Sequence, residues 1–133
     1  MKSVFADTSF YLALWNPADR MHAKASEWVR SSFDRIVVSE FVLLELGNFL
    51  CRSRSRERFP SLVRHLHRDA QTRIIPATSR LLEAGLSLYE RRPDKEWSPT
   101  DCTSFVVMQE QGLRNALTSD HHFEQAGFKV LLR

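Results

Sequence analysis

Short apolar runs alternate with longer amphipathic segments along the whole chain. The apolar runs occupy residues 4–6, 36–38, 73–76, 115–118 and 130–132. A short run without polar alternation is typical of a strand buried on both faces, as in parallel sheets. Because strands and helices alternate, the pattern predicts an α/β fold with a central, mainly parallel sheet of four to five strands and right-handed crossovers.

The intervening segments predict helices with recognisable ends. These helices cover residues 10–15, 21–32, 41–50, 79–90, 98–112 and 121–127, with an arginine-rich helical arm that reaches about residue 71 and is broken near Pro60. The segment 41–50 is apolar nearly all round, which predicts a largely buried helix. Ser79 is the predicted cap of its helix, Ser98-Pro99-Thr100-Asp101 has the form of a capping box, and Gly112 suits a left-handed helix end.

Length and composition indicate one ordinary globular domain. The 133 residues are enough for a single core, and we expect one domain over residues 1–133. No apolar run approaches the length of a membrane span. Two cysteines, Cys51 and Cys102, cannot form a disulfide framework, so we expect reduced, semi-buried thiols in a cytoplasmic protein.

Arginines are concentrated in one part of the chain, although the net charge is only +3. The cluster comprises Arg52, Arg54, Arg56, Arg58, Arg64, Arg68 and Arg73. Clustered arginine is typical of a surface that binds a phosphate-rich partner, because its guanidinium group contacts phosphates in pairs of hydrogen bonds. A solvated helical face explains the same pattern, and both interpretations stay open.

Four acidic residues occupy places that a parallel sheet brings together. Asp7 and Asp120 follow the ends of predicted strands, Asp101 opens a helix, and Glu45 lies in the apolar helix after another strand. Ligands of such sheets bind beyond the carboxyl ends of the strands. Each acid also has a local explanation, because the three aspartates can cap helices and Glu45 can pair with an arginine.

A cluster of four carboxylates favours a metal site for phosphate chemistry. Mutual repulsion makes the empty cluster costly, and oxygen ligands suit Mg²⁺ or Mn²⁺ better than Zn²⁺. Beside a basic arm, such a site suits cleavage of phosphodiester bonds. Phosphatases of the haloacid-dehalogenase type and phosphoacceptor domains also collect acids at strand ends. The former need an aspartate two residues after the nucleophile, where this chain has Ser9.

Four segments, in order, resemble the PIN-domain family, and most closely the VapC-type toxins of bacterial toxin–antitoxin pairs. They are Phe5-Ala6-Asp7-Thr8-Ser9, Val42-Leu43-Leu44-Glu45, the stretch from Trp97 to Phe105 that contains Ser98-Pro99-Thr100-Asp101, and the stretch from Leu117 to Phe128 that contains Thr118-Ser119-Asp120. The resemblance runs from the first predicted strand to the last. It implies a three-layer α/β/α sandwich and a metal-dependent endoribonuclease with Mg²⁺ or Mn²⁺ as cofactor.

The resemblance also implies roles for individual residues and partners. The catalytic and metal-holding acids are expected to be Asp7, Glu45, Asp101 and Asp120. Hydroxyl groups beside the metal or its bound water are expected from Thr8, Ser9 and Ser119. Independently of the resemblance, the arginine cluster supplies the candidates for holding the RNA backbone, which are Arg52, Arg54, Arg56 and Arg64. Family members commonly form homodimers and are inhibited by a cognate antitoxin protein.

One departure from the family pattern concerns the last acid. Some relatives carry a further acid near it, whereas here Ser119 precedes Asp120 and two histidines follow. We expect His121 and His122 to be exposed and outside the catalysis, and Asp94 to be a surface residue rather than an outer member of the cluster. The alternative function is a catalytically silent PIN scaffold that binds RNA or a protein partner.

Overall fold

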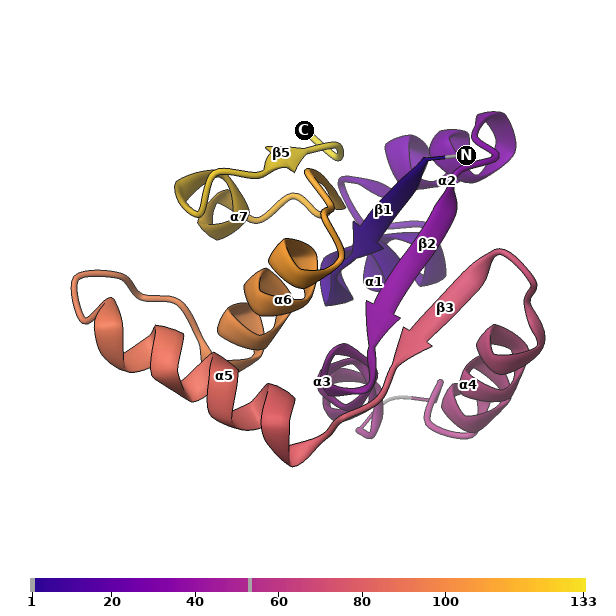
Figure 1. Ribbon diagram of the computed structural model, residues 1–133. Coiled ribbons are helices and arrows are strands. Elements are labelled where there is room, and N and C mark those ends of the chain that lie inside the picture. The colour runs from indigo at the N-terminus through magenta and orange to yellow at the C-terminus, as the bar shows by residue number, and fades with distance from the viewer. Residues whose placement is uncertain (1, 53) are drawn as a thin grey trace.

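A parallel sheet of five strands forms the centre of the protein (Figure 1). The computed structural model describes residues 2–52 and 54–133. The strands are β1 (Ser3–Ala6), β2 (Arg35–Ser39), β3 (Thr72–Ile75), β4 (Asn115–Leu117) and β5 (Lys129–Val130). Every strand pair is parallel, in the order β3-β2-β1-β4-β5, so the predicted α/β class and parallel sheet are confirmed.

Helices cover both faces of the sheet and make the three-layer α/β/α sandwich that was expected. They are α1 (Thr8–Trp15), α2 (His22–Ser31), α3 (Glu40–Leu50), α4 (Arg58–Arg68), α5 (Ser79–Arg91), α6 (Pro99–Glu110) and α7 (His121–Gln125). In Figure 1, α1 and α2 lie behind the sheet and α6 lies in front of it. Within the described chain, no helix has the length and apolar character needed to span a membrane.

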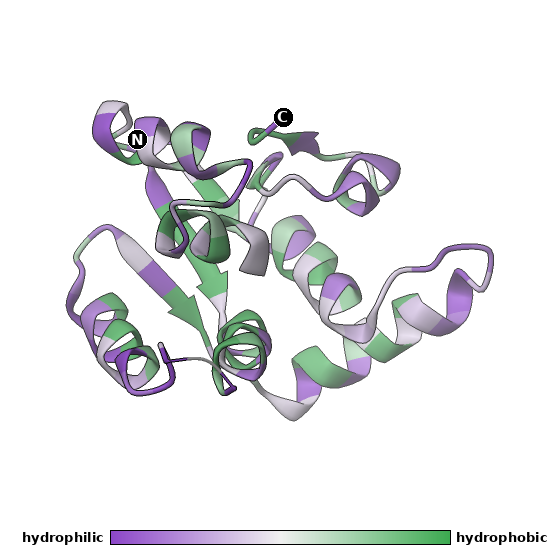
Figure 2. Cartoon of the chain, turned by 180° about the vertical axis from the view of Figure 1, so that it is seen from behind, coloured by the Kyte–Doolittle hydropathy of each residue, from purple (hydrophilic) through white to green (hydrophobic). Residues whose placement is uncertain are grey.

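The strands are apolar because both of their faces are covered. Val4, Phe5 and Ala6 are almost completely buried, and the strands form an apolar centre between the helices (Figure 2). Val4 is in register with Ile36 of β2, and Phe5 with Ala116 of β4. Continuous apolar runs are therefore the expected sequence of these central strands.

The strand order places a topological switch point between β1 and β4. The chain proceeds from β1 through β2 to β3 in one direction, then crosses to β4 and β5 on the other side of β1. At such a point the connections that follow two neighbouring parallel strands lead away to opposite sides of the sheet. In folds of this kind, ligands bind beyond the carboxyl ends of these two strands. Asp7 follows β1, and Thr118-Ser119-Asp120 follows β4. The switch point therefore lies at the predicted acids.

Several helix ends differ from the predictions by one or two residues. Thr78, not Ser79, caps α5, since its hydroxyl accepts a hydrogen bond from the Leu81 N–H. The arginine-rich arm is not one helix interrupted at Pro60, because α4 begins at Arg58 and holds Pro60 in its first turn, where a missing N–H costs nothing. Gly112 has φ +66°, as its predicted helix end requires.

Two predictions of burial were wrong. In α3, Leu44 and Phe49 are each 62 % exposed, because only one side of this apolar helix packs against the core. The cysteines are not both semi-buried: Cys51, beyond the end of α3, is exposed, and Cys102, within α6, is buried. The exposed apolar side chains leave part of α3 available to partners.

Candidate active site

Asp7 lies directly after β1, beside the end of β4, where its backbone N–H donates a hydrogen bond to the Leu117 carbonyl oxygen. Only 6 % of the residue is exposed. Its Oδ2 atom accepts hydrogen bonds from the hydroxyl of Thr118, at 2.9 Å, and from that of Ser9, at 3.3 Å. Although Asp7 precedes the first residue of α1, its side chain makes no capping hydrogen bond. A capping role for the Asp7 side chain is therefore wrong, and the carboxylate is held for another purpose.

Glu45 of α3 reaches the start of α1, next to Asp7. The Thr8 hydroxyl donates a hydrogen bond of 2.5 Å to Glu45 Oε1 and so joins α1 to α3. Thr8 is buried, and Glu45 is partly buried. Among the described residues Glu45 has no arginine partner, so the alternative of a structural ion pair is not supported.

Asp101 has both a local and a tertiary role. Its Oδ2 accepts a hydrogen bond from the Ser98 N–H at 3.1 Å, and the Ser98 hydroxyl accepts one from the Asp101 N–H at 3.0 Å. This is the predicted capping box of α6. The same Oδ2 lies 3.2 Å from Nδ1 of His122. The capping box therefore fixes a carboxylate that also faces the residues after β4.

Asp120 caps α7 and lies beside two histidines. Its Oδ1 accepts a hydrogen bond from the His122 N–H at 2.9 Å, and its own N–H donates to Thr118 Oγ1 at 3.0 Å. Asp120, His121 and His122 each offer one atom that could ligate a metal ion, and these three atoms all lie within 4.8 Å of one another. His121 is exposed, but the His122 side chain is only 20 % exposed and lies between Asp101 and Asp120. The expectation that both histidines are exposed was therefore wrong for His122.

Burial and like charges raise the pKa values of two of these acids. The pKa of Asp7 rises from 3.8 to about 7, mainly because its carboxylate is removed from water. The negative charges of Asp101 and Glu45 add to this rise, while hydrogen bonds from Thr118 and the Thr8 N–H oppose it. Burial also raises the pKa of Asp101, and the charge of Asp120 contributes. These couplings place the four predicted acids in one electrostatic cluster.

The sequence did not reveal the hydroxyl that organises this cluster. Thr118 Oγ1 donates to Asp7 and accepts from the backbone of Asp120, and it lies 3.0 Å from the Ser9 hydroxyl. Ser119 was predicted for such a place, but the contact it makes is through its carbonyl oxygen, which accepts from Arg133 Nε. Successive side chains at a strand end point to opposite sides, so a shift of one residue decides which hydroxyl faces the Asp7 carboxylate.

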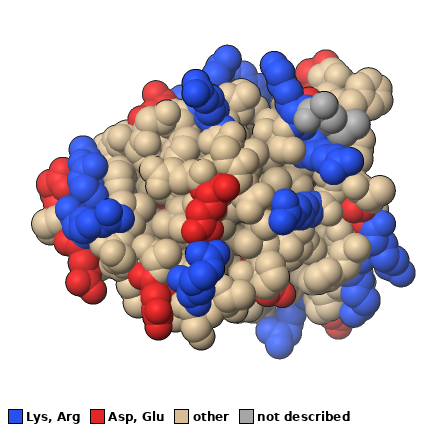
Figure 3. Space-filling view, viewed as in Figure 1, with Lys and Arg blue, Asp and Glu red and all other residues tan. Residues whose placement is uncertain are grey.

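Two further predictions concern residues outside the cluster. Asp94 lies on the surface as expected, with its side chain 59 % exposed and paired with Arg92. The predicted RNA-binding arginines, Arg52, Arg54, Arg56 and Arg64, are all exposed. On the face in Figure 3, basic side chains are spread widely and acidic ones lie among them. Exposure suits both a phosphate-binding role and a solvated face.

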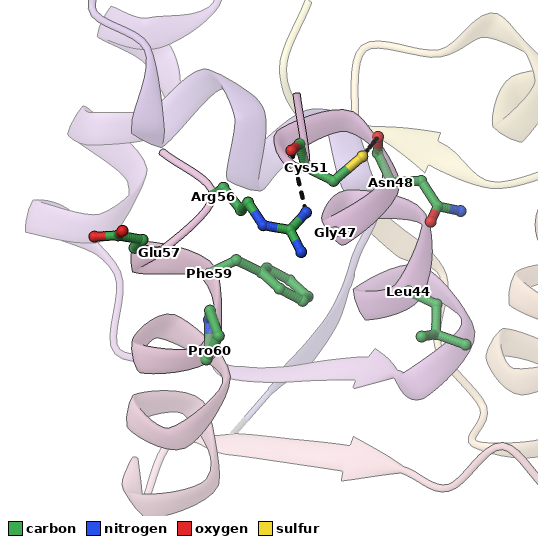
Figure 4. A pocket seen from close by; sticks show the side chains of 8 residues that line it. All are labelled: Leu44, Gly47, Asn48, Cys51, Arg56, Glu57, Phe59 and Pro60. Carbon is green, nitrogen blue, oxygen red and sulfur yellow. Dashed lines mark hydrogen bonds between the residues drawn. The ribbon is translucent and has the colours of Figure 1, made fainter. Parts of the chain in front are cut away.

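An apolar pocket of about 350 Å³ lies between α3 and the start of α4 (Figure 4). Leu44, Phe59 and Pro60 supply its apolar wall. The Phe59 ring approaches Gly47 so closely that a β-carbon there would lie 2.7 Å from the ring. Arg56 borders the pocket and donates to the Cys51 carbonyl oxygen.

Comparison with known proteins relates the chain to one family over almost its entire length. The family model described as "PIN domain" matches residues 4–129. The protein is 33 % identical over 125 residues to "23S rRNA-specific endonuclease VapC20" of Mycobacterium tuberculosis, a match that covers 94 % of this chain and 95 % of the relative.

Solved structures show the same fold. The crystal structure of Mycobacterium tuberculosis VapC20, described as a "Sarcin-Ricin loop cleaving toxin", matches with a TM-score of 0.83 and 32 % identity, covering 94 % of this chain and 95 % of that one. FitAcB from Neisseria gonorrhoeae, at 16 % identity, and VapBC2 from Rickettsia felis bound to promoter DNA, at 13 %, match with TM-scores of 0.70 and 0.66. Each of these two matches covers 96 % of both chains and supports the fold alone. By the sequence match and the shared fold, this chain is a member of the PIN-domain family.

Proposed function

We propose that this protein is a divalent-metal-dependent endoribonuclease and the toxin of a toxin–antitoxin pair. The observation that carries the proposal is the buried carboxylate of Asp7, whose pKa is raised by burial and by the charges of Asp101 and Glu45. Acids held close together against their own repulsion are expected where a cation binds. The related VapC20, a 23S rRNA endonuclease, makes ribosomal RNA the first substrate to test.

The carboxylate oxygens of the cluster are suitable ligands for a hard divalent cation. Carboxylates from Asp7, Glu45, Asp101 and Asp120 would hold it, and oxygen ligands of this kind suit Mg²⁺ or Mn²⁺. When bound, such an ion activates water and stabilises negative charge on the attacked phosphate. Among the described residues, no lysine or arginine forms an ion pair with these four acids, so a cation would relieve their mutual repulsion.

The protein's own residues hold these carboxylates in place before any ligand arrives. Thr118 and Ser9 orient Asp7, and Thr8 orients Glu45. The capping box orients Asp101 through Ser98. Groups that are already oriented need no rearrangement during the reaction, which is the usual source of electrostatic catalysis. In this proposal the hydroxyls of Thr8 and Ser9 would lie beside the cation and help to position water there, while Thr118 takes the place that was predicted for Ser119.

The RNA backbone would be held by the arginines that follow α3. Arg52, Arg54, Arg56 and Arg64 are exposed, and their guanidinium groups can pair with phosphate oxygens. Arginine contacts with phosphates strengthen binding without reading the base sequence. This arrangement supplies affinity and leaves the choice of cleavage site to other contacts.

Partner proteins are part of the proposal. FitAcB and VapBC2 match this fold, and we propose a cognate antitoxin and a homodimer for this chain as well. The exposed apolar residues Leu44 and Phe49 on α3, with Leu82, Leu86 and Tyr89 on α5, are suited to such contacts. We place the protein in the cytoplasm, where such a toxin meets RNA.

The decisive experiment compares ribosomal RNA cleavage by the purified chain with Mg²⁺, with Mn²⁺ and with EDTA. Asp101→Asn is the test variant, because the amide oxygen can still accept from the Ser98 N–H and preserve the capping box. Asp94→Asn is the matched control, since Asp94 lies on the surface. We expect cleavage by the parent and the control with metal, and loss of at least 100-fold in Asp101→Asn.

Other outcomes would redirect the assignment. Cleavage that persists in EDTA, or that Asp101→Asn retains at the parent rate, would contradict a metal site at this cluster. RNA binding without cleavage in every metal would favour a silent scaffold. Circular dichroism of both variants checks that the fold is intact.

A further inference from the structure

A cavity of about 530 Å³ opens at the far end of the seam between α1 and α3. Leu12 and Trp15 of α1 line one side, and Leu50 at the end of α3 lines another. Ser55 and Arg58, before and at the start of α4, complete the wall. The cavity is large enough for one nucleobase with its sugar, since small-molecule sites begin at about 300 Å³.

An arginine and a tryptophan form a stacked pair in this cavity. The Arg58 guanidinium carbon lies 4.6 Å from the centre of the Trp15 ring. The Trp15 indole N–H donates a hydrogen bond of 2.8 Å to the Ser55 hydroxyl, which fixes the plane of the ring. Arg58 is exposed, so the flat guanidinium group is accessible from solvent. RNA-binding proteins stack unpaired bases on such aromatic and guanidinium planes.

One stripe of α1 connects this cavity to the acid cluster. Thr8, which binds Glu45, is followed at i+4 by Leu12 and at i+7 by Trp15. Residues at these spacings share one face of a helix. Seven residues of helix rise by about 10 Å, or roughly three nucleotides at the 3.4 Å charge spacing of a stacked strand. A strand with a phosphate at the acids can therefore reach the cavity.

Polar groups at the mouth of the cavity could contact the edge of a base. The exposed Asn16 accepts a hydrogen bond from the Ala18 N–H with its Oδ1, so its side-chain NH2 group is the donor that it can offer to a ligand. Asp19 uses Oδ1 to accept from the Met21 N–H and retains Oδ2 as an acceptor. One donor and one acceptor beside a stacking plane match the edge of a base, whereas an apolar peptide side chain would leave both unpaired.

We propose that the Trp15–Arg58 cavity is a nucleobase subsite, which takes one unpaired base of the RNA a few nucleotides from the cleaved bond. Stacking on the guanidinium plane holds the base, and Asn16 and Asp19 select it by its edge. The inference rests on the proposed ribonuclease function and adds to it a determinant of where the RNA is placed. The exposed arginines nearby hold the backbone that enters the cavity.

The test measures binding of a short single-stranded RNA and of the same strand with abasic sugars, in an Asp7→Asn background that does not cut. Trp15→Leu and Arg58→Ala remove the stacking, while Trp15→Phe retains an aromatic ring and Arg58→Lys retains the charge. Arg80→Ala, which removes an exposed arginine paired with Glu110, is the matched control. We expect a 5- to 100-fold loss of affinity for intact RNA in Trp15→Leu and Arg58→Ala, and a smaller loss in Trp15→Phe.

Two comparisons separate stacking from charge. The abasic strand should bind all Trp15 variants equally, and Trp15→Leu should leave the salt dependence of binding unchanged, because no phosphate contact is lost. Affinity of Trp15→Leu and Arg58→Ala within twofold of the background would overturn the subsite, as would an equal loss for intact and abasic RNA. A failure of RNA binding in the background itself would overturn the subsite too. Cleavage by the wild-type chain separately reports whether the ribonuclease function stands. Thermal melting checks the fold of each variant.

Discussion

The buried carboxyl group of Asp7 should make the stability of the metal-free protein depend on pH. Its pKa is 3.8 in an unfolded chain and about 7 in the fold. Between pH 4 and 7 the unfolded chain loses this proton while the folded protein keeps it. Stability contributed by the protonated group is therefore lost as pH rises through this range, and the loss is complete above pH 7. At about 1.36 kcal/mol for each pH unit, ionised Asp7 costs the fold about 4 kcal/mol.

Asp7→Asn removes that cost, because the amide stays neutral at every pH. Its oxygen can still accept the hydrogen bonds from Thr118 and Ser9 that Asp7 Oδ2 receives. We therefore expect the variant to match the parent near pH 4 and to exceed its free energy of unfolding by as much as about 4 kcal/mol at pH 8. The same variant should not cleave RNA. Stability and activity would then move in opposite directions, as expected for a site held together against repulsion.

The measurement is urea unfolding of both proteins at pH 4, 5, 6, 7 and 8 in EDTA, so that no cation neutralises the cluster. Asp94→Asn serves as the control, because Arg92 lowers the pKa of that exposed carboxyl. The free energy of unfolding of Asp94→Asn should not exceed that of the parent at high pH. Equal stability of parent and Asp7→Asn at pH 8, or a difference that does not grow between pH 4 and 7, would refute this account of the site.

Three other results should follow from the same structure. RNA affinity should fall steeply with salt, and replacing both Arg52 and Arg54 by Gln should make the slope of log K against log salt less negative by about 1.4; an unchanged slope would make the arm a solvated face. Millimolar Mg²⁺ or Mn²⁺ should raise the melting temperature of the parent by several degrees but not that of Asp101→Asn, as a ligand specific to the fold must; equal shifts would count against a site there. Gly85→Ala should lower the free energy of unfolding by about 1–3 kcal/mol, since a β-carbon would lie 2.6 Å from the Thr103 methyl group and 3.2 Å from its backbone; an unchanged urea midpoint would show that α5 and α6 are packed less tightly.

Local sequence determined the elements and the places of the acids. Val4–Ala6 and Ile36–Val38 are apolar because central parallel strands are covered on both faces. Such a run can be recognised from a few consecutive residues, without knowledge of the fold. An acid directly after such a strand lies at the carboxyl edge of the sheet whatever the remaining packing. The capping box at Ser98 and Asp101 depends on a spacing of three residues, so it too could be predicted without a fold.

Only the tertiary structure decided how these elements meet. Thr118 contacts Asp7 across 111 positions of sequence, Thr8 contacts Glu45 across 37, and Trp15 meets Ser55 across 40. No periodicity encodes such pairs, because each depends on the direction of two side chains after packing. The exposure of Leu44 has the same origin: an all-apolar helix is buried only where another element covers it. The sequence thus located the acids at one edge of the sheet, whereas long-range packing selected the hydroxyls and the histidine around them and brought Arg58 onto Trp15 at the other end of α1.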